Sequence, residues 1–306
     1  MSPNDDGGTL QQAIEQLRDR AVVVLTGAGI STDSGIPAYR GPGSRPSNPI
    51  TVQEYMGSEQ ARRRYWARNH LGWRRVKWAV PNEGHQALAE LERGGAVRAV
   101  ITQNVDRLHE DSGSENVVDL HGRVDQIICT ECGDLLRRRT LEEILTSLNP
   151  GFVERAEALG VVEAPDADAQ IDDSLAREFV VAPCPRCGGV LKPDFVFFGE
   201  NVPKPRLARA LKLVDEAEVL LVAGTSLTVM SGLRFVRQAA KAGTPVVLVN
   251  QGPTRGDEFA TVRLHSGTSE TLRAVADALL PRRSAGRSHG AERVTVEGLA
   301  AEQGIR

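Results

Sequence analysis

Four short apolar runs limit the folds that this 306-residue chain can adopt. They are rich in valine, leucine and isoleucine, and they lie at Ala21–Leu25, Val97–Ile101, Val219–Val222 and Val246–Val249. Runs of this length and composition are expected of strands that are buried on both faces of a parallel sheet. Amphipathic helical patterns precede or separate them, at residues 9–19, 83–91 and 233–242. The alternation predicts an α/β fold with a doubly wound, Rossmann-like parallel sheet.

Two stretches interrupt this alternation, and we expect both to leave the main sheet and return to it. Residues 42–78 are rich in arginine and tryptophan and are predicted to be a helical insertion, whereas residues 122–189 contain all the cysteines. Together they are predicted to form a second, smaller domain. The larger domain is then discontinuous and consists of residues 9–41, 79–121 and 190–280.

Both ends of the chain are predicted to be tails. Residues 1–8 are polar and glycine-rich, and residues 281–306 have no sustained apolar period, so we expect the second tail to be disordered.

The four cysteines form two Cys-x-x-Cys pairs, Cys129 with Cys132 and Cys184 with Cys187. A glycine follows each pair, which is typical of the turn that lets two thiolates face one ion. Four thiolates complete the tetrahedral coordination of Zn²⁺ and leave no position for a reactive water. The spacing therefore predicts one structural zinc ion, so the chemistry must lie elsewhere. The alternative, two disulfides, is less favoured because the N-terminus does not resemble a signal peptide.

Charge and hydropathy exclude two classes of partner. The formal net charge is −3, whereas a dedicated nucleic-acid binder is expected to be basic. No apolar run approaches the roughly 20 residues that span a bilayer. We therefore expect no nucleic-acid partner, no membrane and a cytoplasmic location.

Polar loops follow the four apolar runs. They are Thr26–Ser31, Gln103–Asp106, Gly224–Ser226 and Asn250–Gly252. Open parallel sheets bind ligands at the carboxyl ends of their strands, so these loops predict a ligand crevice. The first loop, with Gly27-Ala28-Gly29, is typical of turns that let a pyrophosphate approach backbone N–H groups. Thr32 replaces the third glycine of the dinucleotide fingerprint, so a plain strand-to-helix turn remains an alternative for this loop.

Two further features lie near this predicted crevice. Residues 34–41 form a loop with Gly and Pro that ends in an aromatic residue and an arginine, a candidate lid over a ligand. His121 lies just before the cysteine-containing insertion, at the joint between the predicted domains. A lone histidine is more often structural than catalytic, but an unperturbed pKa near 6.5 would let it accept a proton at neutral pH.

The motifs occur in an order that resembles the sirtuin family. They are GAGIS, GIPAYRG, TQNVDRLH, the His121-Gly122 pair, the two Cys-x-x-Cys pairs, FFGE at residues 197–200, GTS and VNQG. The resemblance covers about residues 9–280, and the long spacer between the cysteine pairs is most similar to the class II branch. It implies an NAD⁺-consuming, zinc-containing protein-lysine deacylase, whose partners are acylated proteins or peptides.

The resemblance also implies roles for particular residues. The diphosphate of NAD⁺ would be held by Gly27, Ala28, Gly29 and Ser31, with Arg40 nearby and Pro37 and Tyr39 in the lid. The nicotinamide and its ribose would contact Gln103, Asn104, Val105 and Asp106. The adenosine half would be lined by Gly224, Thr225, Ser226, Asn250, Gln251, Gly252 and Thr268.

The implied catalytic residues are His121, Asn104 and Asp106. The acyl-lysine oxygen attacks C1′ of NAD⁺, nicotinamide leaves, and His121 then takes a proton from the ribose hydroxyls, so that the acyl group passes to ADP-ribose. Residues 190–197 and the loop after them would receive the substrate peptide by backbone pairing.

The chain departs from the family pattern at one position and leaves the acyl group open. Family members usually have aspartate and phenylalanine where this chain has Ala38 and Tyr39, which puts in doubt how the lid is ordered around NAD⁺. Tyr65 and Arg68 share a helix face and resemble the pair that holds succinyl or malonyl groups. The alternative for that segment is a basic amphipathic helix.

Three other functions remain open at this point. Mono-ADP-ribosyl transfer to a protein uses the same NAD⁺ chemistry, and a non-catalytic NAD⁺-binding scaffold would need no base. A hydride-transferring dehydrogenase is disfavoured by the missing third glycine.

Overall fold

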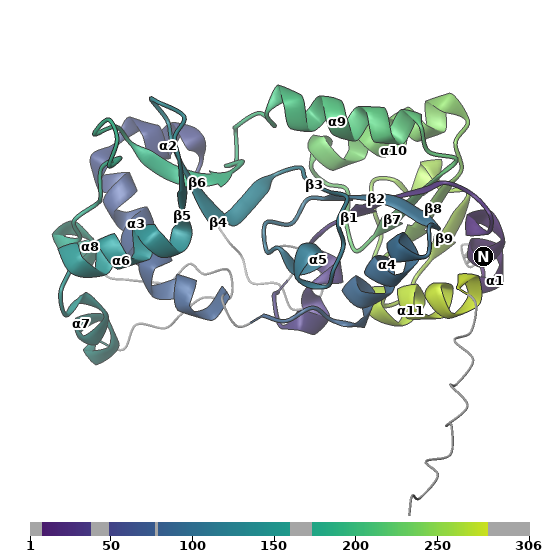
Figure 1. Ribbon diagram of the computed structural model, residues 1–306, viewed down its shortest axis with the longest axis horizontal. Helices are drawn as coiled ribbons and strands as arrows, with labels where there is room; N and C mark the ends of the chain where they lie inside the picture. The colour runs from purple at the N-terminus through teal and green to yellow at the C-terminus, as the bar shows by residue number, and fades with distance from the viewer. Residues whose placement is uncertain (1–7, 38–48, 77–78, 160–172, 281–306) are drawn as a thin grey trace, which may run out of the picture.

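The computed structural model describes residues 8–37, 49–76, 79–159 and 173–280. Two sheets, each with its own helices, occupy the two ends of the molecule (Figure 1). The strands of the larger sheet are β1 (Val22–Thr26), β2 (Val97–Thr102), β3 (Val117–Asp119), β7 (Val219–Ala223), β8 (Val246–Val249) and β9 (Val262–Leu264). Every pairing between these strands is parallel. Their spatial order, β3-β2-β1-β7-β8-β9, is that of dinucleotide-binding α/β folds. The predicted fold class is confirmed.

The strand register brings the four polar loops to one edge of this sheet. Thr26 pairs with Thr102 of β2 on one side and with Ala223 of β7 on the other, and Ala223 pairs with Val249 of β8. The last residues of four strands therefore lie in one row, and the loops that follow them begin side by side.

Helices cover both faces of the larger sheet, as a parallel sheet requires. One face is covered by α1 (Leu10–Leu17), α4 (Glu83–Arg93) and α11 (Thr268–Leu279), and the other by α9 (Lys204–Asp215) and α10 (Met230–Ala242). Helix α1 begins at the predicted capping box, in which the Thr9 side chain accepts from the Gln12 backbone and the Gln12 side chain accepts from the Thr9 backbone.

Short helical elements connect these layers. They are η1 (Ala28–Ile30), η2 (Thr32–Ser34), α5 (Leu108–Asp111) and η3 (Asp257–Phe259).

The smaller domain combines both predicted insertions. Its antiparallel sheet has the order β5-β4-β6, with β4 (Gly122–Cys129), β5 (Leu135–Arg137) and β6 (Leu191–Phe195). Its helices are α2 (Val52–Gly57), α3 (Glu59–Val76), α6 (Arg138–Leu148), α7 (Phe152–Ala158) and α8 (Asp173–Glu178). Trp66 of α3 shares one core with Ile127 of β4, Leu145 of α6 and Phe179 after α8. The two insertions therefore bury their apolar faces against each other.

Two predicted boundaries differ from the structure. Residues 190–280 were predicted to lie in the larger domain, but β6 belongs to the small sheet, where Leu191 pairs with Cys129. The chain continues the small sheet after the second cysteine pair and returns to the larger domain only at α9. At the other end, Gly8 was predicted to lie in the tail, but it donates a backbone hydrogen bond to Arg263 of β9.

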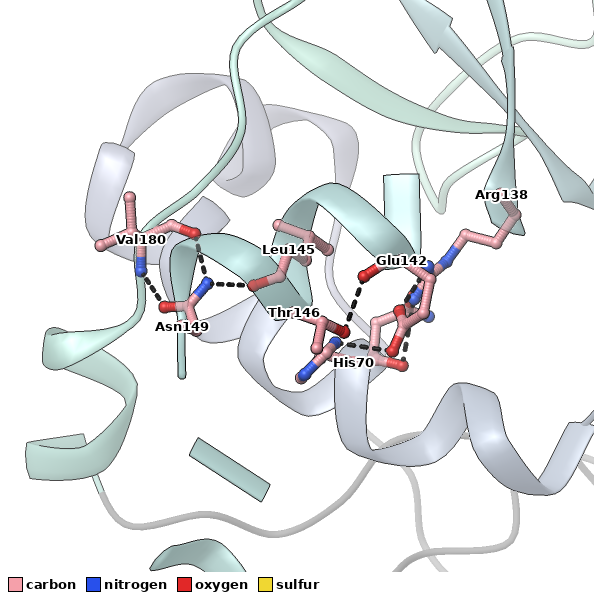
Figure 2. A network of polar contacts seen from close by, with 8 residues as sticks. His70, Arg138, Glu142, Leu145, Thr146, Asn149 and Val180 are labelled. Carbon is pink, nitrogen blue, oxygen red and sulfur yellow. Dashed lines mark hydrogen bonds and ion pairs between the residues drawn. The ribbon is translucent and has the colours of Figure 1, made fainter. Parts of the chain in front are cut away.

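A buried polar network ties α3 to α6 inside the smaller domain (Figure 2). The side chain of Arg138 is 1% exposed; its guanidinium donates to Asn69 Oδ1 and to Glu142 Oε2. His70 Nδ1 lies 2.7 Å from the second oxygen of Glu142. Buried charges need such partners, because an unpaired one is costly in a low-dielectric core.

Candidate active site

The loops after β1 and β7 pack backbone against backbone, and this contact requires glycine. Gly29 N–H donates to the Gly224 carbonyl at 2.7 Å. A Cβ atom at Gly29 would lie 2.8 Å from that same oxygen, and one at Gly27 would lie 2.7 Å from Thr225 Cβ. Gly224 itself has φ +66°, a left-handed conformation that favours glycine. The backbone of the GAGIS motif therefore packs directly against that of the GTS motif, and each needs its glycines for the other to fit.

A cluster of three polar side chains joins the loop after β1 to the loop after β2. Ser31 Oγ donates to Asp106 Oδ2 at 2.7 Å, and Asn104 Nδ2 donates to Ser31 Oγ at 3.0 Å and to the Gly27 carbonyl at 3.2 Å. Burial raises the pKa of the Asp106 carboxyl, and hydrogen bonds from the Leu108 backbone and the Ser31 hydroxyl oppose the rise. Three predicted site residues thus form one connected unit.

Gln103 spans the loops after β1 and β7. Its side-chain amide donates to the Thr26 carbonyl and to Thr225 Oγ1, both at 3.1 Å. Thr268, at the start of α11, donates to the Gly29 carbonyl at 3.2 Å and so lies against the same first loop. Gln103 lies at the carboxyl edge, where the sequence predicted it, and Thr268 contacts the loop after β1.

Four further predicted site residues lie in the loops after β7 and β8. Asn250 Nδ2 donates to the Gly252 carbonyl within its own loop, where Gln251 is exposed. Ser226 Oγ lies 2.9 Å from Thr228 Oγ1.

The remaining predicted residues lie at the domain joint and in the lid. The Val105 carbonyl accepts from Val124 of β4, which ties the loop after β2 to the smaller domain. Ala28 lies in η1, and Pro37 is exposed at the end of the described lid segment. Tyr39 and Arg40, together with Ala38, lie outside the described residues.

His121 lies at the joint between the two sheets, between the end of β3 and the start of β4 (Figure 1). Its Nδ1 is 2.9 Å from the Gln103 carbonyl oxygen and its Nε2 is 2.8 Å from Ser231 Oγ. Burial lowers the pKa of the imidazole, and the hydrogen bond to Gln103 opposes that shift. A ring that is neutral at physiological pH and held at a domain joint can serve as a general base.

Sequence reasoning missed two histidines behind the Ser31 cluster. His85 of α4 has Nε2 3.5 Å from Ser31 Oγ, and His109 of α5 has Nε2 2.9 Å from Thr26 Oγ1. Their rings lie 4.9 Å apart, and burial lowers the pKa of His85 to about 4. The sequence does contain an indication that His85 is buried. It lies among the apolar residues of a predicted helix, three residues after the capping residue Asn82.

Aromatic side chains lie beside His121 on the smaller-domain side. The His121 carbonyl accepts from Val196 N–H at 2.7 Å, which brings Phe197 next to the joint. The Phe197 ring is 5.0 Å from that of Tyr55 and 5.5 Å from that of Tyr65. Tyr65 and Arg68 are both half-buried on α3. Phe197, Tyr55 and Tyr65 therefore form an aromatic wall between α3 and the segment that hydrogen-bonds to His121.

The four cysteine sulfurs converge at the far end of β4. Among the described residues they form the one cluster of three or more potential metal ligands, with all sulfurs within 4.8 Å of one another. Cys129 and Cys187 sulfurs are 3.5 Å apart, and Cys132 and Cys184 sulfurs are 3.9 Å apart. A tetrahedral site with Zn–S bonds of about 2.3 Å has S···S edges of about 3.8 Å, whereas a disulfide bond is about 2.05 Å. The donor set fits a structural zinc ion, and all four cysteines are free.

Across the residues that the structure describes, no helix is both long enough and apolar enough to cross a bilayer.

Comparisons with known proteins agree with this geometry. A curated "NAD-dependent protein deacetylase 1" of Mycobacterium avium is 55% identical over 271 residues, which is 88% of this chain and 95% of that protein. One of the same name from Streptomyces coelicolor is 52% identical over 272 residues, covering 88% of this chain and 90% of that protein. A Sir2 structure solved with a p53 peptide and NAD⁺ aligns with a TM-score of 0.66 and 30% identity, over 88% of this chain and 98% of that one.

The profile of the Sir2 family matches residues 27–231, which include the glycine loops, the Ser31 cluster, His121 and the cysteine site. The predicted resemblance is confirmed, and the chain belongs to the Sir2 family, the sirtuins.

Proposed function

We propose that this sirtuin is an NAD⁺-dependent protein-lysine deacetylase that transfers the acyl group from lysine to ADP-ribose and releases nicotinamide. Relatives at 55% and 52% identity bear the name NAD-dependent protein deacetylase. The observation that carries the proposal is the position of His121. Its imidazole, with a lowered pKa, lies where the carboxyl edge of the nucleotide-binding sheet meets the smaller domain.

NAD⁺ is the co-substrate in this proposal, and its nicotinamide end lies near the Ser31–Asn104–Asp106 cluster. An amide and a carboxylate there offer a donor and an acceptor for a carboxamide and for ribose hydroxyls. Backbone groups of Gly27, Ala28 and Gly29 hold the diphosphate, and the loops after β7 and β8, with Thr268, line the adenosine half. The chemistry that NAD⁺ supplies is a glycosidic bond that breaks when the acyl-lysine oxygen attacks C1′.

His121 acts as the general base. It accepts a proton from a ribose hydroxyl, so that the deprotonated oxygen can attack the carbon that came from the acyl group. Asn104 and Asp106 hold the reacting ribose in place. Phe197 and the neighbouring tyrosines exclude water from the joint, which favours acyl transfer to ADP-ribose over hydrolysis.

The substrate is an acylated protein or peptide, which binds along β6. This strand lies at the end of the order β5-β4-β6, so one of its edges is not used within that sheet. On that edge the Leu191 carbonyl accepts from Tyr55, the Pro193 carbonyl accepts from Lys192, and proline has no N–H to donate. We therefore assign the main-chain pairing of the extended peptide to the end of β6 and the loop after it. A Sir2 protein has been solved with a p53 peptide and NAD⁺, which supports this class of ligand.

The zinc ion is structural, because four thiolates leave no open coordination position. A cytoplasmic location is part of the proposal, since four free thiols are typical of a reducing compartment.

The test is mass spectrometry of the products formed from NAD⁺ and an acetyl-lysine peptide. We expect nicotinamide, deacetylated peptide and acetyl-ADP-ribose in equal amounts. Because nicotinamide leaves before His121 acts, we expect His121→Ala to abolish the other two products and to release no more than one nicotinamide per enzyme. ADP-ribose bound to protein, without deacetylated lysine, would favour mono-ADP-ribosyl transfer instead.

A preference for an acidic acyl group is a second candidate for the same site. It is supported by the half-buried Tyr65 and Arg68 on α3 and by the 5.5 Å separation of the Tyr65 and Phe197 rings. A panel of acetyl, succinyl, long-chain and lipoyl peptides decides between them. Equal rates with acetyl and succinyl peptides, unchanged in Arg68→Leu, would eliminate the acidic preference.

A further inference from the structure

The hydrogen bonds of His121 determine which ring nitrogen is basic. A carbonyl oxygen can only accept a hydrogen bond, so the Gln103 carbonyl requires a proton on His121 Nδ1. In a neutral imidazole the other nitrogen, Nε2, then carries the lone pair. The partner of Nε2 is Ser231 Oγ at 2.8 Å, and a hydroxyl group can donate to that lone pair.

The first turn of α10 is built to approach His121. Ser231 is the second residue of this 13-residue helix. The next residue, Gly232, is buried, and a Cβ atom there would lie 2.5 Å from Gln103 Oε1. A larger residue at this position would have to displace the Gln103 side chain, which is itself held by hydrogen bonds to Thr26 and Thr225. The backbone carbonyl of Gln103 holds the other side of the imidazole.

The electrostatic setting of this contact favours a neutral ring. The N-terminal end of α10 has no side-chain cap, and the partial positive charge of a helix N-terminus opposes a cation nearby. Several charged groups lie near the joint. Arg206 of α9 lies against Gly122 and pairs with Asp194 of β6, and Asp119 of β3 interacts with Arg206 and also with Arg107, Glu110 and Asp125. Burial lowers the pKa of His121, and the hydrogen bond to the Gln103 backbone raises it by a smaller amount.

We propose that Ser231 is a positioning residue for the general base: before the substrates bind, its hydroxyl occupies the hydrogen-bonding position at His121 Nε2 and holds the ring with Nδ1 protonated. The inference rests on the proposed function for its role in catalysis. When NAD⁺ binds, the ribose hydroxyl that loses its proton replaces the Ser231 hydroxyl at Nε2. The proton then passes from the ribose oxygen to Nε2, and the imidazolium forms with its Nδ1–H still on Gln103.

Ser231→Ala has a predictable effect on the free enzyme. The hydroxyl donates to the neutral ring but accepts from the imidazolium, and the charge-assisted hydrogen bond is about twice as strong. Loss of the Ser231 hydroxyl therefore destabilises the imidazolium more than the neutral ring. The pKa of His121 is expected to fall by about half to one pH unit. Ser231→Thr keeps the hydroxyl and is expected to keep the wild-type value.

Two measurements test the proposal. The first is NMR titration of the ¹⁵N-labelled histidines in the substrate-free protein, which reports the tautomer and the pKa of His121 without any need for activity. The second is the pH dependence of kcat/KM and of kcat. The acidic limb of kcat/KM reports the free enzyme and is expected to move to lower pH in Ser231→Ala, whereas that of kcat reports the bound complex and is expected to stay.

The outcomes separate this inference from the proposed function. A wild-type ring with its proton on Nε2, or an unchanged or raised His121 pKa in Ser231→Ala, overturns the role of Ser231 even if deacetylation is normal. The expected NMR shift in a protein without deacetylase activity overturns only the proposed function. Ser147→Ala, on the exposed side of α6, is the matched control and is expected to leave the titration and both pH profiles unchanged.

Discussion

At the scale of single residues, Asp106 is a carboxyl group that is buried although its charged form would be better solvated by water. Its carboxyl is buried, its pKa is raised, and it accepts hydrogen bonds from Ser31 and from the Leu108 backbone. A carboxyl whose pKa is raised on folding makes the folded state less stable above that pKa, because the charged form is poorly solvated there. A loss of folding stability of this kind is expected at functional sites rather than at structural ones.

Asp106→Asn is therefore expected to lower kcat/KM by at least about tenfold without lowering stability at pH 7. The free energy of unfolding should be equal to or above that of the wild type at pH 7. The difference should shrink as the pH falls through the folded pKa and should vanish below the ordinary pKa of 3.8, where the wild-type carboxyl is protonated in both states. Urea unfolding at several pH values, together with initial rates, measures both effects. A less stable variant at pH 7 would show that the carboxylate is structural.

At the scale of secondary-structure elements, α3 and α6 are held together by charge as well as by apolar contact. Arg138 of α6 lies under two aromatic rings of α3, 4.8 Å from the Trp73 centroid and 5.6 Å from that of Trp66. Glu142 completes the network with Arg138 and His70 (Figure 2). Because α3 also carries Tyr65, this network supports the aromatic wall beside the site.

Glu142→Gln is expected to destabilise the protein by about 3 kcal/mol, because it leaves Arg138 buried without its anionic partner. The neighbouring residue offers a matched control, since Glu143 pairs with Arg139 on the same helix but both side chains are exposed. Glu143→Gln is expected to cost less than about 0.5 kcal/mol. Thermal and urea unfolding of the two variants makes the comparison, and equal losses would contradict the role given to the buried network.

At the scale of the whole molecule, the cysteine site connects the two halves of the smaller domain. Cys129 ends β4, whereas Cys184 and Cys187 precede β6, and these two strands pair with each other. Cys129 and Cys184 are also buried in the core that α3, α6 and α8 share. One ion therefore stabilises both the small sheet, whose strand β4 begins directly after His121, and the core that lies behind the aromatic wall.

Removal of zinc with a chelator is expected to unfold the smaller domain and to abolish deacetylation. A structural zinc ion contributes to folding directly, because its site does not exist in the unfolded chain. Circular dichroism and intrinsic tryptophan fluorescence follow the loss, since the three tryptophans all lie in residues 66–78. Unchanged stability in the metal-free protein would show that the cysteine cluster has another role.

The sequence by itself determined the elements that depend on local pattern. The apolar runs predicted four of the six strands of the larger sheet, the polar loops were expected at the carboxyl ends of those strands, and the cysteine spacing predicted the metal cluster. These predictions succeed because periodicity, the carboxyl-edge rule and ligand spacing are all properties of neighbouring residues.

Contacts between distant residues were decided only by the tertiary structure. The Ser231–His121 pair is 110 positions apart, and the Arg138–Asn69 pair is 69 apart. The membership of β6 in the small sheet is likewise decided by its pairing with β4. A serine, an arginine or a short strand has many possible partners along a chain, and only the packed fold brings one of them within hydrogen-bonding distance.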